Sequence, residues 1–233
     1  MMRNEADVAV QVVRHMLAEV DRVIVADNNS TDGTRELLEA IDDPRLTIAD
    51  EPRVAYYQPD TMMRLVAMAD AEWIVPFDAD EWWFSTEAGT IAETLSGKEW
   101  GIVVQVPSWE MVPQPSDDER ESDPFRRIVW RRREANTQKV AFRPGPGRTL
   151  GMGNHHLVDL MQTTDRNPLE IRHYPYRTFE QTAAKLRSGK AALDATDYHP
   201  GIGEHWRKLG ALGDEQLRGW FEYWMAPIDL VAS

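Results

Sequence analysis

The chain has 233 residues, no cysteine and a formal net charge of −13 at pH 7. Without cysteine it has no disulfide, catalytic thiol or cysteine-based metal site, and its acidity argues against generic binding to nucleic acid or anionic membranes. Polar residues at positions 3, 4, 5 and 7 interrupt any signal-like start, and no apolar run reaches the length of a membrane span. We therefore expect a soluble, cytoplasmic protein.

The first third of the chain alternates between helical and strand patterns. The predicted elements are, in chain order, a helix over 5–20, a strand over 22–26, a helix over 34–41, a strand over 46–49, a helix over 60–71 and a strand over 73–77. This alternation predicts an α/β fold with a largely parallel sheet and helices on both of its faces.

The rest of the chain is less regular. Its predicted elements are a helix over 86–95, a strand over 102–107, an acidic surface loop over 114–124, strands over 125–130 and 139–143, a glycine-rich loop over 145–156, a strand over 169–174, a helix over 179–193 and one or two helices over 204–224. We expect one α/β domain over residues 1–200 and a C-terminal helical appendage over 201–233.

Three carboxylates follow the predicted strand 73–77, namely Asp78, Asp80 and Glu81. Alternate side chains of an extended chain point the same way, so Asp78 and Asp80 are expected to converge on one point. Two such oxygen donors suit Mg²⁺ or Mn²⁺ bound to a diphosphate, and open α/β sheets bind ligands at this edge. Without a metal, the two carboxylates are expected to repel each other. The alternative interpretation is a solvated acidic turn.

A polar loop, DNNSTDGT over residues 27–34, follows the predicted strand 22–26. We expect Asp27 and Asn29 in this loop to contact a nucleotide, with the aspartate accepting hydrogen bonds from the base or ribose. A well-capped connection between a strand and a helix would have the same composition.

The order of these motifs resembles that of a known family. RNEAD and VDRVIVADNNSTDGT, with IVPFDADE some forty residues later, resemble the family 2 glycosyltransferases of GT-A fold. The segments GMGNHHL and RHYPYRTFEQTAAKLRSGKAAL are similar to the C-terminal half of a bacterial branch of that family. The resemblance implies a GT-A type α/β fold and transfer of a sugar, usually with inversion, from a nucleotide-diphosphate donor such as a UDP- or GDP-sugar. It also implies a divalent cation, Mn²⁺ or Mg²⁺.

The resemblance also assigns roles to individual residues. Asp27 matches the family's nucleotide-contacting acid, and Asp78 and Asp80 match its motif for metal and diphosphate. His155 falls at the family's glycine-flanked histidine, where we expect it to complete the metal shell or to donate to a phosphate oxygen. A structural or exposed histidine in the loop is the alternative.

The segment RHYPYRTFEQTAAKLRSGKAAL contains three further candidate site residues, His173, Arg177 and Lys185. Arg177 and Lys185 are expected to contact the donor phosphates, although exposed helix charges look the same in a sequence. An inverting transfer also needs a general base for the acceptor. The candidates for it are Glu81, Glu110, His173 and the acidic cluster 117–121. Glu81 fits equally well as a residue that orients the metal ligands, and His173 as a core histidine.

Two further stretches have a distinctive composition. Residues 126–148 contain eight lysines and arginines against one acid, and this basic window is expected to face an anionic partner, either the donor diphosphate or a charged acceptor. In the tail, Leu217, Trp220, Phe221 and Trp224 recur at helical spacing. This C-terminal stripe is expected to pack on the domain or on a second subunit of a homo-oligomer.

The function predicted from the sequence is transfer of a sugar from a nucleotide-sugar donor. The acceptor stays open among a glycan, a lipid, a protein and a modified nucleobase. One alternative is a non-catalytic protein that binds a nucleotide or glycan on the same fold. Another is a polyanion-binding module that uses the basic window, which the overall negative charge disfavours.

Overall fold

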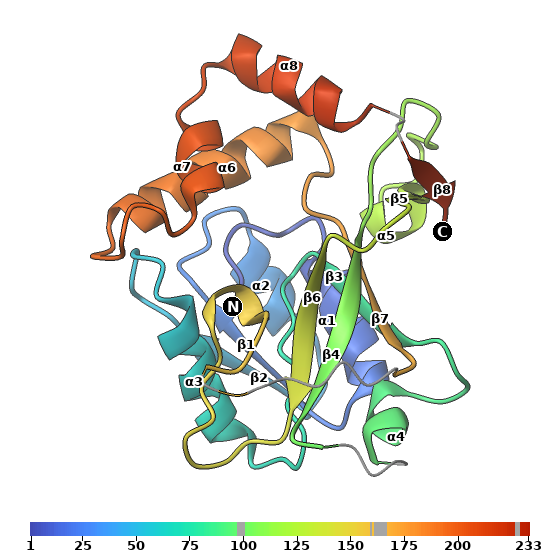
Figure 1. Ribbon diagram of the computed structural model, residues 1–233, viewed down its shortest axis with the longest axis vertical. Coiled ribbons are helices and arrows are strands. Elements are labelled where there is room, and N and C mark those ends of the chain that lie inside the picture. Colours follow the sequence, from blue (N-terminus) through green and yellow to red (C-terminus); the bar gives the residue numbers. More distant parts are fainter. Residues whose placement is uncertain (97–100, 159, 161–166, 227–228) are drawn as a thin grey trace.

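The structure is a computed structural model that describes residues 1–96, 101–158, 160, 167–226 and 229–233. Over residues 1–69 it confirms the predicted alternation of helices and strands (Figure 1). The elements there are α1 (Ala9–Glu19), β1 (Val23–Asp27), α2 (Thr34–Glu39), β2 (Leu46–Asp50) and α3 (Gln58–Ala69).

The remainder of the described chain completes the sheet and adds the C-terminal helices. Its elements are β3 (Glu81–Ser85), α4 (Ile91–Ser96), β4 (Val103–Glu110), α5 (Pro124–Arg127), β5 (Trp130–Arg132), β6 (Thr137–Phe142), the 3₁₀ turn η1 (Met152–Asn154), β7 (Leu169–His173), α6 (Phe179–Asp194), α7 (Glu204–Gly210), α8 (Asp214–Trp224) and β8 (Leu230–Ala232). Strand β8, which pairs with β5, was not predicted.

The strands of the described residues form three sheets, of which the smallest outlying one is the pair β5–β8. Strands β1 and β2 pair in parallel, and a second group has the order β3-β7-β4-β6. Within that group β4 and β7 run parallel, whereas β3–β7 and β4–β6 are antiparallel. The α/β class is thus confirmed, but the pairing is more mixed than predicted because the second half of the chain folds back along β4.

Two predicted strands are wrong. The run 73–77 is not a regular strand, and only Ile74 in it forms a bridge, with Phe142 of β6. Within the described part of the chain, no strand pairs with its opposite edge. The run 125–130 begins instead with helix α5, because the Asp123 carboxylate accepts a hydrogen bond from the Phe125 N–H at 3.0 Å and Pro124 occupies the first turn. An aspartate followed by a proline is a helix-start signal.

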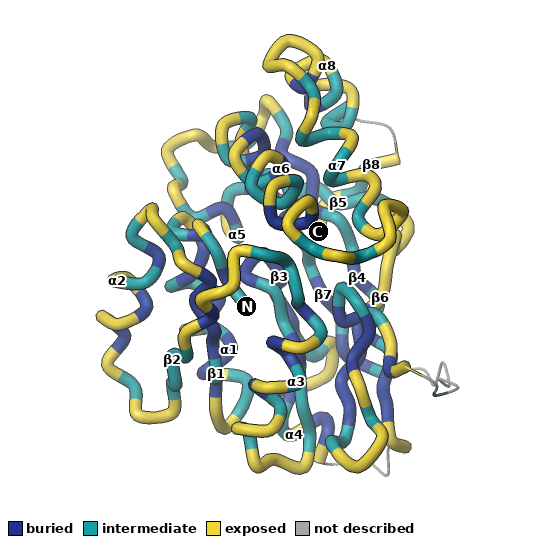
Figure 2. Tube along the Cα trace, turned by 90° about the vertical axis from the view of Figure 1, so that its left-hand side faces the viewer, coloured by how far each residue is buried: buried dark blue, intermediate teal, exposed yellow. Residues whose placement is uncertain are grey.

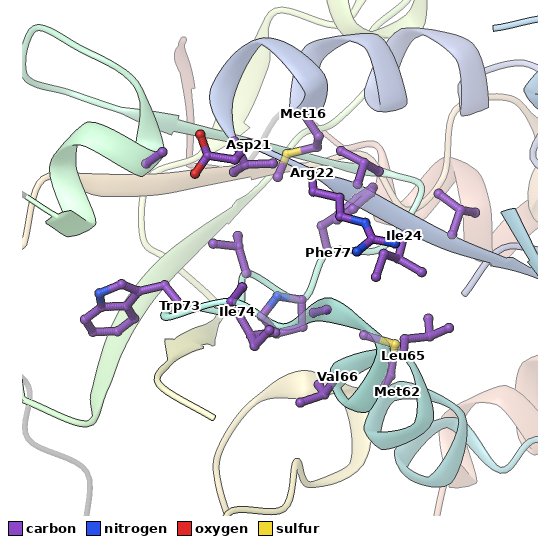
Figure 3. A pocket seen from close by; sticks show the side chains of 18 of the residues that line it. Met16, Asp21, Arg22, Ile24, Met62, Leu65, Val66, Trp73, Ile74 and Phe77 are labelled. Carbon is purple, nitrogen blue, oxygen red and sulfur yellow. The ribbon is translucent and has the colours of Figure 1, made fainter. Parts of the chain in front are cut away.

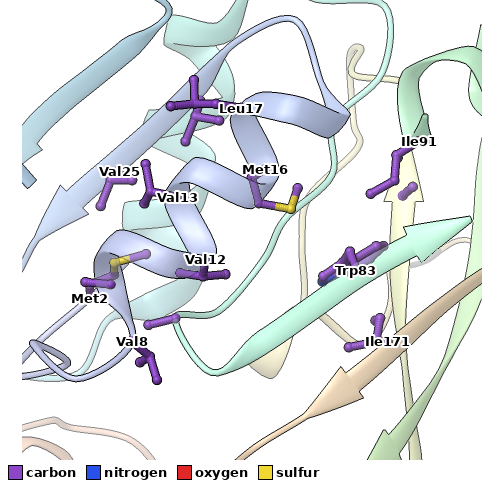
Figure 4. Close-up of a cluster of buried hydrophobic side chains, with 14 of the residues drawn as sticks. Met2, Val8, Val12, Val13, Met16, Leu17, Val25, Trp83, Ile91 and Ile171 are labelled. Atoms are coloured by element: carbon purple, nitrogen blue, oxygen red, sulfur yellow. The ribbon is translucent and has the colours of Figure 1, made fainter. Parts of the chain in front are cut away.

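Helix α1 packs on the sheet through one apolar face (Figure 4). Its residues Val12, Val13 and Met16 are buried together with Val25 of β1 and Trp83 of β3. The tube coloured by burial shows dark, buried segments along the sheet and on the faces of the helices turned toward it (Figure 2). Burial of apolar surface here holds both groups of strands against the same helix.

The C-terminal helices have a core of their own. The buried residues Ala183, Leu186 and Leu217 pack there with Tyr176, Phe179, Trp206, Leu209, Leu212 and Trp220. The C-terminal stripe therefore packs within the chain, one of the two arrangements predicted for it. No helix of the described residues is long and apolar enough to cross a membrane.

Helices α6 and α7 approach each other closely at two glycines. A Cβ atom added to Gly210 would lie 2.5 Å from the carbonyl oxygen of Leu186, and one added to Gly189 would meet the Trp206 ring at 2.1 Å. Backbone cannot move aside as a flexible side chain can. The spacing of the two helices therefore depends on Gly210.

We expect Gly210→Ala to destabilise the protein by about 1–3 kcal/mol, because the new methyl group forces α7 away from α6. The melting temperature should fall by roughly 2–4 °C per kcal/mol for a chain of this size. Gly219→Ala is the matched control, since Gly219 lies inside α8 with open space around its Cα. Alanine there should stabilise by up to ~1 kcal/mol. Equal effects of the two substitutions would contradict the close packing.

Candidate functional site

The three predicted carboxylates lie together at the edge of the sheet, where each has a basic partner. Asp78 accepts from the Lys139 ammonium at 2.6 Å, and the same ammonium lies 2.7 Å from a Glu81 carboxylate oxygen. Asp80 lies against the Lys185 ammonium, and the His173 Nε2 is 3.4 Å away. The acids that were expected to repel each other are therefore held by separate cations.

Lys139 projects from β6 and is almost completely buried. Burial alone would lower the pKa of this ammonium, but the Asp78 and Glu81 carboxylates outweigh burial and raise it. Burial likewise opposes the charged form of Asp78, while Lys139 holds the pKa of that carboxyl below its ordinary value. Lys139 and Asp78 are consequently both charged at neutral pH, and each charge has a close partner of opposite sign.

Asp80 is the more strongly stabilised anion of the pair. Burial disfavours its charge, yet Lys185 and His173 hold the pKa of Asp80 well below its usual range. In return the Asp80 carboxylate raises the pKa of the His173 imidazole, against the opposing effect of burial. Lys185 comes from α6, so this contact ties the C-terminal half of the chain to the DADE turn.

Arg177 joins the cluster to the RNEAD segment. Its fully buried guanidinium donates to Glu5 at 2.6 Å and to Asp7 at 2.7 Å and 2.9 Å. It also donates to the main-chain oxygen of Tyr174 at 3.1 Å. Lys185 lies 3.4 Å from the other Glu5 oxygen. Lys185 therefore lies at the DADE turn, whereas the N–H groups of Arg177 are hydrogen-bonded to Glu5, Asp7 and the Tyr174 carbonyl.

The charges of this cluster do not balance. Five carboxylates take part, against three side chains that are permanently cationic. The carboxylates are Glu5, Asp7, Asp78, Asp80 and Glu81, and the cations are Lys139, Arg177 and Lys185. With every carboxylate ionised, two negative charges remain in excess, which His173 reduces to one when it is protonated. Burial raises the pKa of Glu5, so this excess is an upper bound. The cluster is therefore suited to take up additional positive charge.

Sheet register brings the three named general-base candidates into one row. His173 of β7 is paired with Glu81 of β3 on one side and with Glu110 of β4 on the other. Glu81 is completely buried and also accepts from the Trp83 indole and the Asp78 N–H, both at 3.2 Å. Glu110 is half-buried, with Arg132 3.9 Å away. Of the two carboxylates, that of Glu110 has the weaker contacts, since Glu81 is held by Lys139, Trp83 and the Asp78 N–H.

The acidic cluster 117–121 is part of a surface loop. Asp118 is exposed and pairs with Arg120 at 2.9 Å, and Asp117 accepts from the Gln114 N–H at 2.9 Å. These contacts lie within the loop itself, so they give no support to a catalytic role.

The glycine-rich loop reaches the DADE turn through residues that the sequence did not single out. Gln58 of α3 accepts from the Gly153 N–H at 2.8 Å, and its own amide lies 3.4 Å from an Asp78 oxygen. The Asn154 amide nitrogen is also 3.4 Å from that oxygen, while the Asn154 side-chain oxygen is buried with no hydrogen-bond partner among the described residues. This oxygen is available as a ligand for a metal ion beside Asp78.

His155 follows in the same loop and is half-buried. Its Nδ1 lies 2.7 Å from the Gln138 carbonyl, so Nδ1 carries the proton and Nε2 has a free lone pair. Burial lowers the pKa of this imidazole, which keeps it neutral. Its Nε2 packs over Gly153, where a Cβ would come within 2.5 Å. His156 is exposed.

The loop after β1 lies at the same edge of the sheet. Asp27 is nearly buried, and one of its oxygens has no hydrogen-bond partner among the described residues. Asn28 and Asn29 donate to main-chain oxygens of residues 51–53 and so hold this loop against the one after β2. Asp27 therefore presents a free acceptor, whereas the Asn29 amide is engaged with Pro52 at 2.9 Å.

The basic window does not form one continuous surface. Lys139 is buried in the ionic cluster, Arg143 pairs with Glu72, and Arg148 donates to main-chain oxygens within its own loop. Arg131 lies over the Trp109 ring and Arg132 donates to the main-chain oxygen of Trp224. Much of the positive charge thus has partners inside the protein, so the prediction of an anion-binding face has little support.

A comparison with known protein families supplies the identification. The sequence matches the family model "Glycosyl transferase family 2" over residues 1–151, which is more than half of the chain. The chain belongs to glycosyl transferase family 2. No curated protein matches it. The part matched to the glycosyl transferase model contains the Asp27 loop, the DADE turn and Lys139, whereas Asn154, His155 and Lys185 come from the chain beyond it.

A divalent cation fits this glycosyl transferase site. Among the described residues, no three acidic, histidine or cysteine side chains are grouped as a metal cage. Mg²⁺, however, is commonly held by one or two carboxylates together with substrate phosphates. Asp78 and Asp80 would supply the carboxylates, and the Asn154 oxygen, which has no hydrogen-bond partner among the described residues, would supply a further ligand.

We expect Arg177→Ala to lower the free energy of unfolding by about 3–5 kcal/mol, because it leaves the buried Glu5 without its main partner. The melting temperature should fall by several degrees, as measured by calorimetry. Arg126→Ala is the control, since that side chain is 77% exposed and lies 3.6 Å from Asp123. It should change stability by less than ~0.5 kcal/mol. An Arg177→Ala protein of normal stability that has lost nucleotide affinity would show instead that Arg177 binds phosphate.

Proposed function

We propose that this protein transfers a sugar from a nucleotide-diphosphate donor, with inversion, to an acceptor. The observation that supports this most strongly is the cluster around Asp78 and Asp80. Two ionised carboxylates lie at the ligand-binding edge of an α/β sheet, within a cluster that carries excess negative charge. Such a site is poised to hold Mg²⁺ or Mn²⁺ with the donor diphosphate.

A bound cation would stabilise the charge that develops on the departing nucleoside diphosphate. Asp78, Asp80 and Asn154 are the residues that would hold it, and His155 offers its neutral Nε2 to the same region. Glu81 orients Asp78 by accepting from its N–H and by sharing Lys139 with it. Lys139 and Lys185 keep both aspartates ionised.

The remaining candidate residues are assigned either to binding the nucleotide or to activating the acceptor. Asp27, with its free oxygen, accepts from the base or ribose, and Asn29 shapes the loop around it. Lys185 is close enough to Asp80 to turn from that carboxylate to a donor phosphate. Glu110 is the proposed general base, because its carboxylate is partly exposed in the row beside His173. His173 holds the Asp80 carboxylate in place and forms an ion pair with it when the imidazole is protonated.

The direct test is a screen for slow donor hydrolysis across nucleotide sugars, with and without Mn²⁺. We expect one donor class to be hydrolysed in a metal-dependent way and to raise the melting temperature. Metal-dependent binding of one nucleotide without turnover, in the presence of candidate acceptors, would indicate a non-catalytic binding protein. If no nucleotide binds, the proposed function is wrong.

Asp80→Asn should lower turnover by a factor of hundreds, corresponding to ~3–4 kcal/mol of lost transition-state stabilisation. It should also abolish the rise in melting temperature produced by metal and nucleotide together. Because Asp80 is paired with Lys185 and His173, the variant should be somewhat less stable than wild type rather than more stable. Asp118→Asn, a change at an exposed loop carboxylate, serves as the control. Full EDTA-sensitive transfer by Asp80→Asn would disprove the metal role.

His155→Ala should reduce turnover by about 10–100-fold, the usual cost of losing a residue that supports a metal site. Its melting temperature should change little, because the imidazole makes one side-chain hydrogen bond, to Gln138. His156→Ala removes the neighbouring exposed imidazole and is the matched control. A greater loss of turnover in His156→Ala would reverse the assignment of this pair.

A further inference from the structure

The side chain of Arg3 is partly buried and has no partner. Two of its three guanidinium nitrogens, Nε and Nη1, are buried without a hydrogen-bond partner among the described residues, and no ion pair of the described chain includes it. Arg207 also has one such nitrogen, but its two others donate to Asp194 and to the Leu193 carbonyl. The chain has 39 acidic residues, so the missing partner is a matter of position and not of composition.

An unpaired guanidinium is costly to bury. Taking a charge out of water is unfavourable unless an opposite charge or a set of hydrogen bonds replaces the water. Arginine does not avoid this cost by losing its proton, because its side chain stays protonated in proteins. Buried polar groups are nearly always bonded, and one without a partner in the chain points to an ion or ligand that binds there. For a guanidinium, that ligand is an anion.

Arg3 is held at the end of β1 by the residues on both sides of it. Met2 before it forms a parallel bridge with Asp27, the last residue of β1. Asn4 after it accepts from the Thr31 N–H at 2.7 Å through its side chain. The main chain of Asn4 has a φ of 55°, a left-handed conformation that asparagine adopts more readily than most residues. The chain therefore bends at residues 3 and 4, beside the Asp27 loop.

An apolar cavity between β1 and the segment 73–77 shows where the apolar interior ends (Figure 3). Its volume is about 540 Å³, and Met1 and Met2 are among the residues that line it, whereas Arg3 is not. The chain thus leaves the apolar interior at Arg3. The Asp27 loop begins at this same edge of the sheet.

Arg3 connects the two parts of the proposed donor site along the chain. On one side is Asp27, which is proposed to contact the base or ribose. On the other side, the Glu5 carboxylate lies 3.4 Å from the Lys185 ammonium, which is paired with Asp80 in the proposed metal and diphosphate site. The first phosphate of a nucleoside diphosphate is attached to the ribose and carries the second, so it must lie between these two parts. An arginine with open N–H groups at this place fits that phosphate.

The other cations of the site have partners in the chain. Arg177, Lys139 and Lys185 each contact carboxylates at 3.4 Å or less. Each of them would have to give up such a contact to bind a phosphate. Arg3 would gain a partner without losing one, so binding of an anion would remove the cost of its burial.

We propose that Arg3 binds the first phosphate of the donor diphosphate, with two of its N–H groups donating to oxygens of that phosphate. A guanidinium presents parallel N–H groups in one plane, which match two phosphate oxygens, whereas an ammonium acts as a point charge. Arg3 thereby takes the role that the sequence motif suggested for Arg177. The inference rests on the proposed function, because it needs a nucleoside diphosphate as the donor.

This role has a consequence for the stability of the ligand-free protein. An arginine that holds the fold together lowers the melting temperature when it is removed, whereas removal of an unpaired buried charge raises it. Arg3→Met removes the charge and keeps an unbranched, apolar side chain. The direction of the change in melting temperature therefore separates a structural role from a ligand-binding role.

The test compares wild type, Arg3→Met, Arg3→Lys and the control Arg126→Met, since the Arg126 side chain is 77% exposed. Melting temperatures are measured without ligand. Binding is then measured by titration calorimetry with Mn²⁺ and the diphosphates of uridine, guanosine, adenosine and cytidine. The diphosphate that wild type binds most tightly is compared with its own monophosphate, which carries the first phosphate alone.

We expect Arg3→Met to melt ~2 °C or more above wild type. It should bind both the diphosphate and the monophosphate about 10–100-fold more weakly, because each loses charge-assisted hydrogen bonds. Arg3→Lys should lose a smaller factor, since it keeps the charge but not the planar pair of donors. Arg126→Met should match wild type in both measurements.

Four results would overturn the inference. A lower melting temperature of Arg3→Met would show that Arg3 supports the fold. Unchanged affinity of Arg3→Met for a diphosphate that wild type binds would overturn the inference and leave the proposed function intact. A loss confined to the diphosphate would place Arg3 at the second phosphate and contradict its assignment to the first. If wild type binds none of the four diphosphates, the proposed function fails and this inference fails with it.

Discussion

The structure depends on the pairing of buried and half-buried carboxylates with two lysines at the edge of the sheet. Asp78, Asp80 and Glu81 occupy one short turn, and each lies within 4 Å of a lysine ammonium. Burial alone would raise the pKa values of Asp78 and Asp80, and Lys139 and Lys185 reverse that effect and keep the two carboxylates ionised. These lysines come from β6 and α6, so ionisation of the turn requires the C-terminal half of the chain to be folded around it.

The same requirement extends to the N-terminal segment. Glu5 is shared by Lys185 and Arg177, and Arg177 also holds Asp7. The RNEAD segment, the DADE turn and the start of α6 are therefore fixed relative to one another by charge rather than by the apolar core. Ion pairs are directional, so they define the positions of the carboxylates more narrowly than apolar packing would. The proposed binding of a metal and a diphosphate would benefit from this rigidity.

The sequence predicted the elements whose signals are local. The helix over 179–193 and the strands over 22–26 and 169–174 were placed within two residues, because apolar periodicity and capping decide such segments. The run 73–77 was misread because its composition is that of a buried strand, while one of its edges faces a cavity. Residues 125–130 were misread because the Asp-Pro helix start was overlooked.

The candidate site was predictable in part. Asp78 and Asp80 were singled out because their alternation is visible in the sequence, and the family motifs pointed to Lys185 and His173, which the structure places beside Asp80. Lys139 was counted only as one charge of the basic window, although a lysine beside the buried run Val140–Ala141–Phe142 indicates an inward ammonium. Gln58 and Asn154 carry no motif. Their place beside Asp78 follows from long-range packing, which a single sequence does not display.

Locating the metal is the most direct test of the proposed site. Crystals grown with Mn²⁺ and a nucleoside diphosphate would show manganese by anomalous scattering. We expect one peak within about 2.0–2.6 Å of oxygens of both Asp78 and Asp80, with at least one of the lysines displaced toward the diphosphate. A bound nucleotide with no manganese at these carboxylates, and with Lys139 and Lys185 still paired to them, would contradict it.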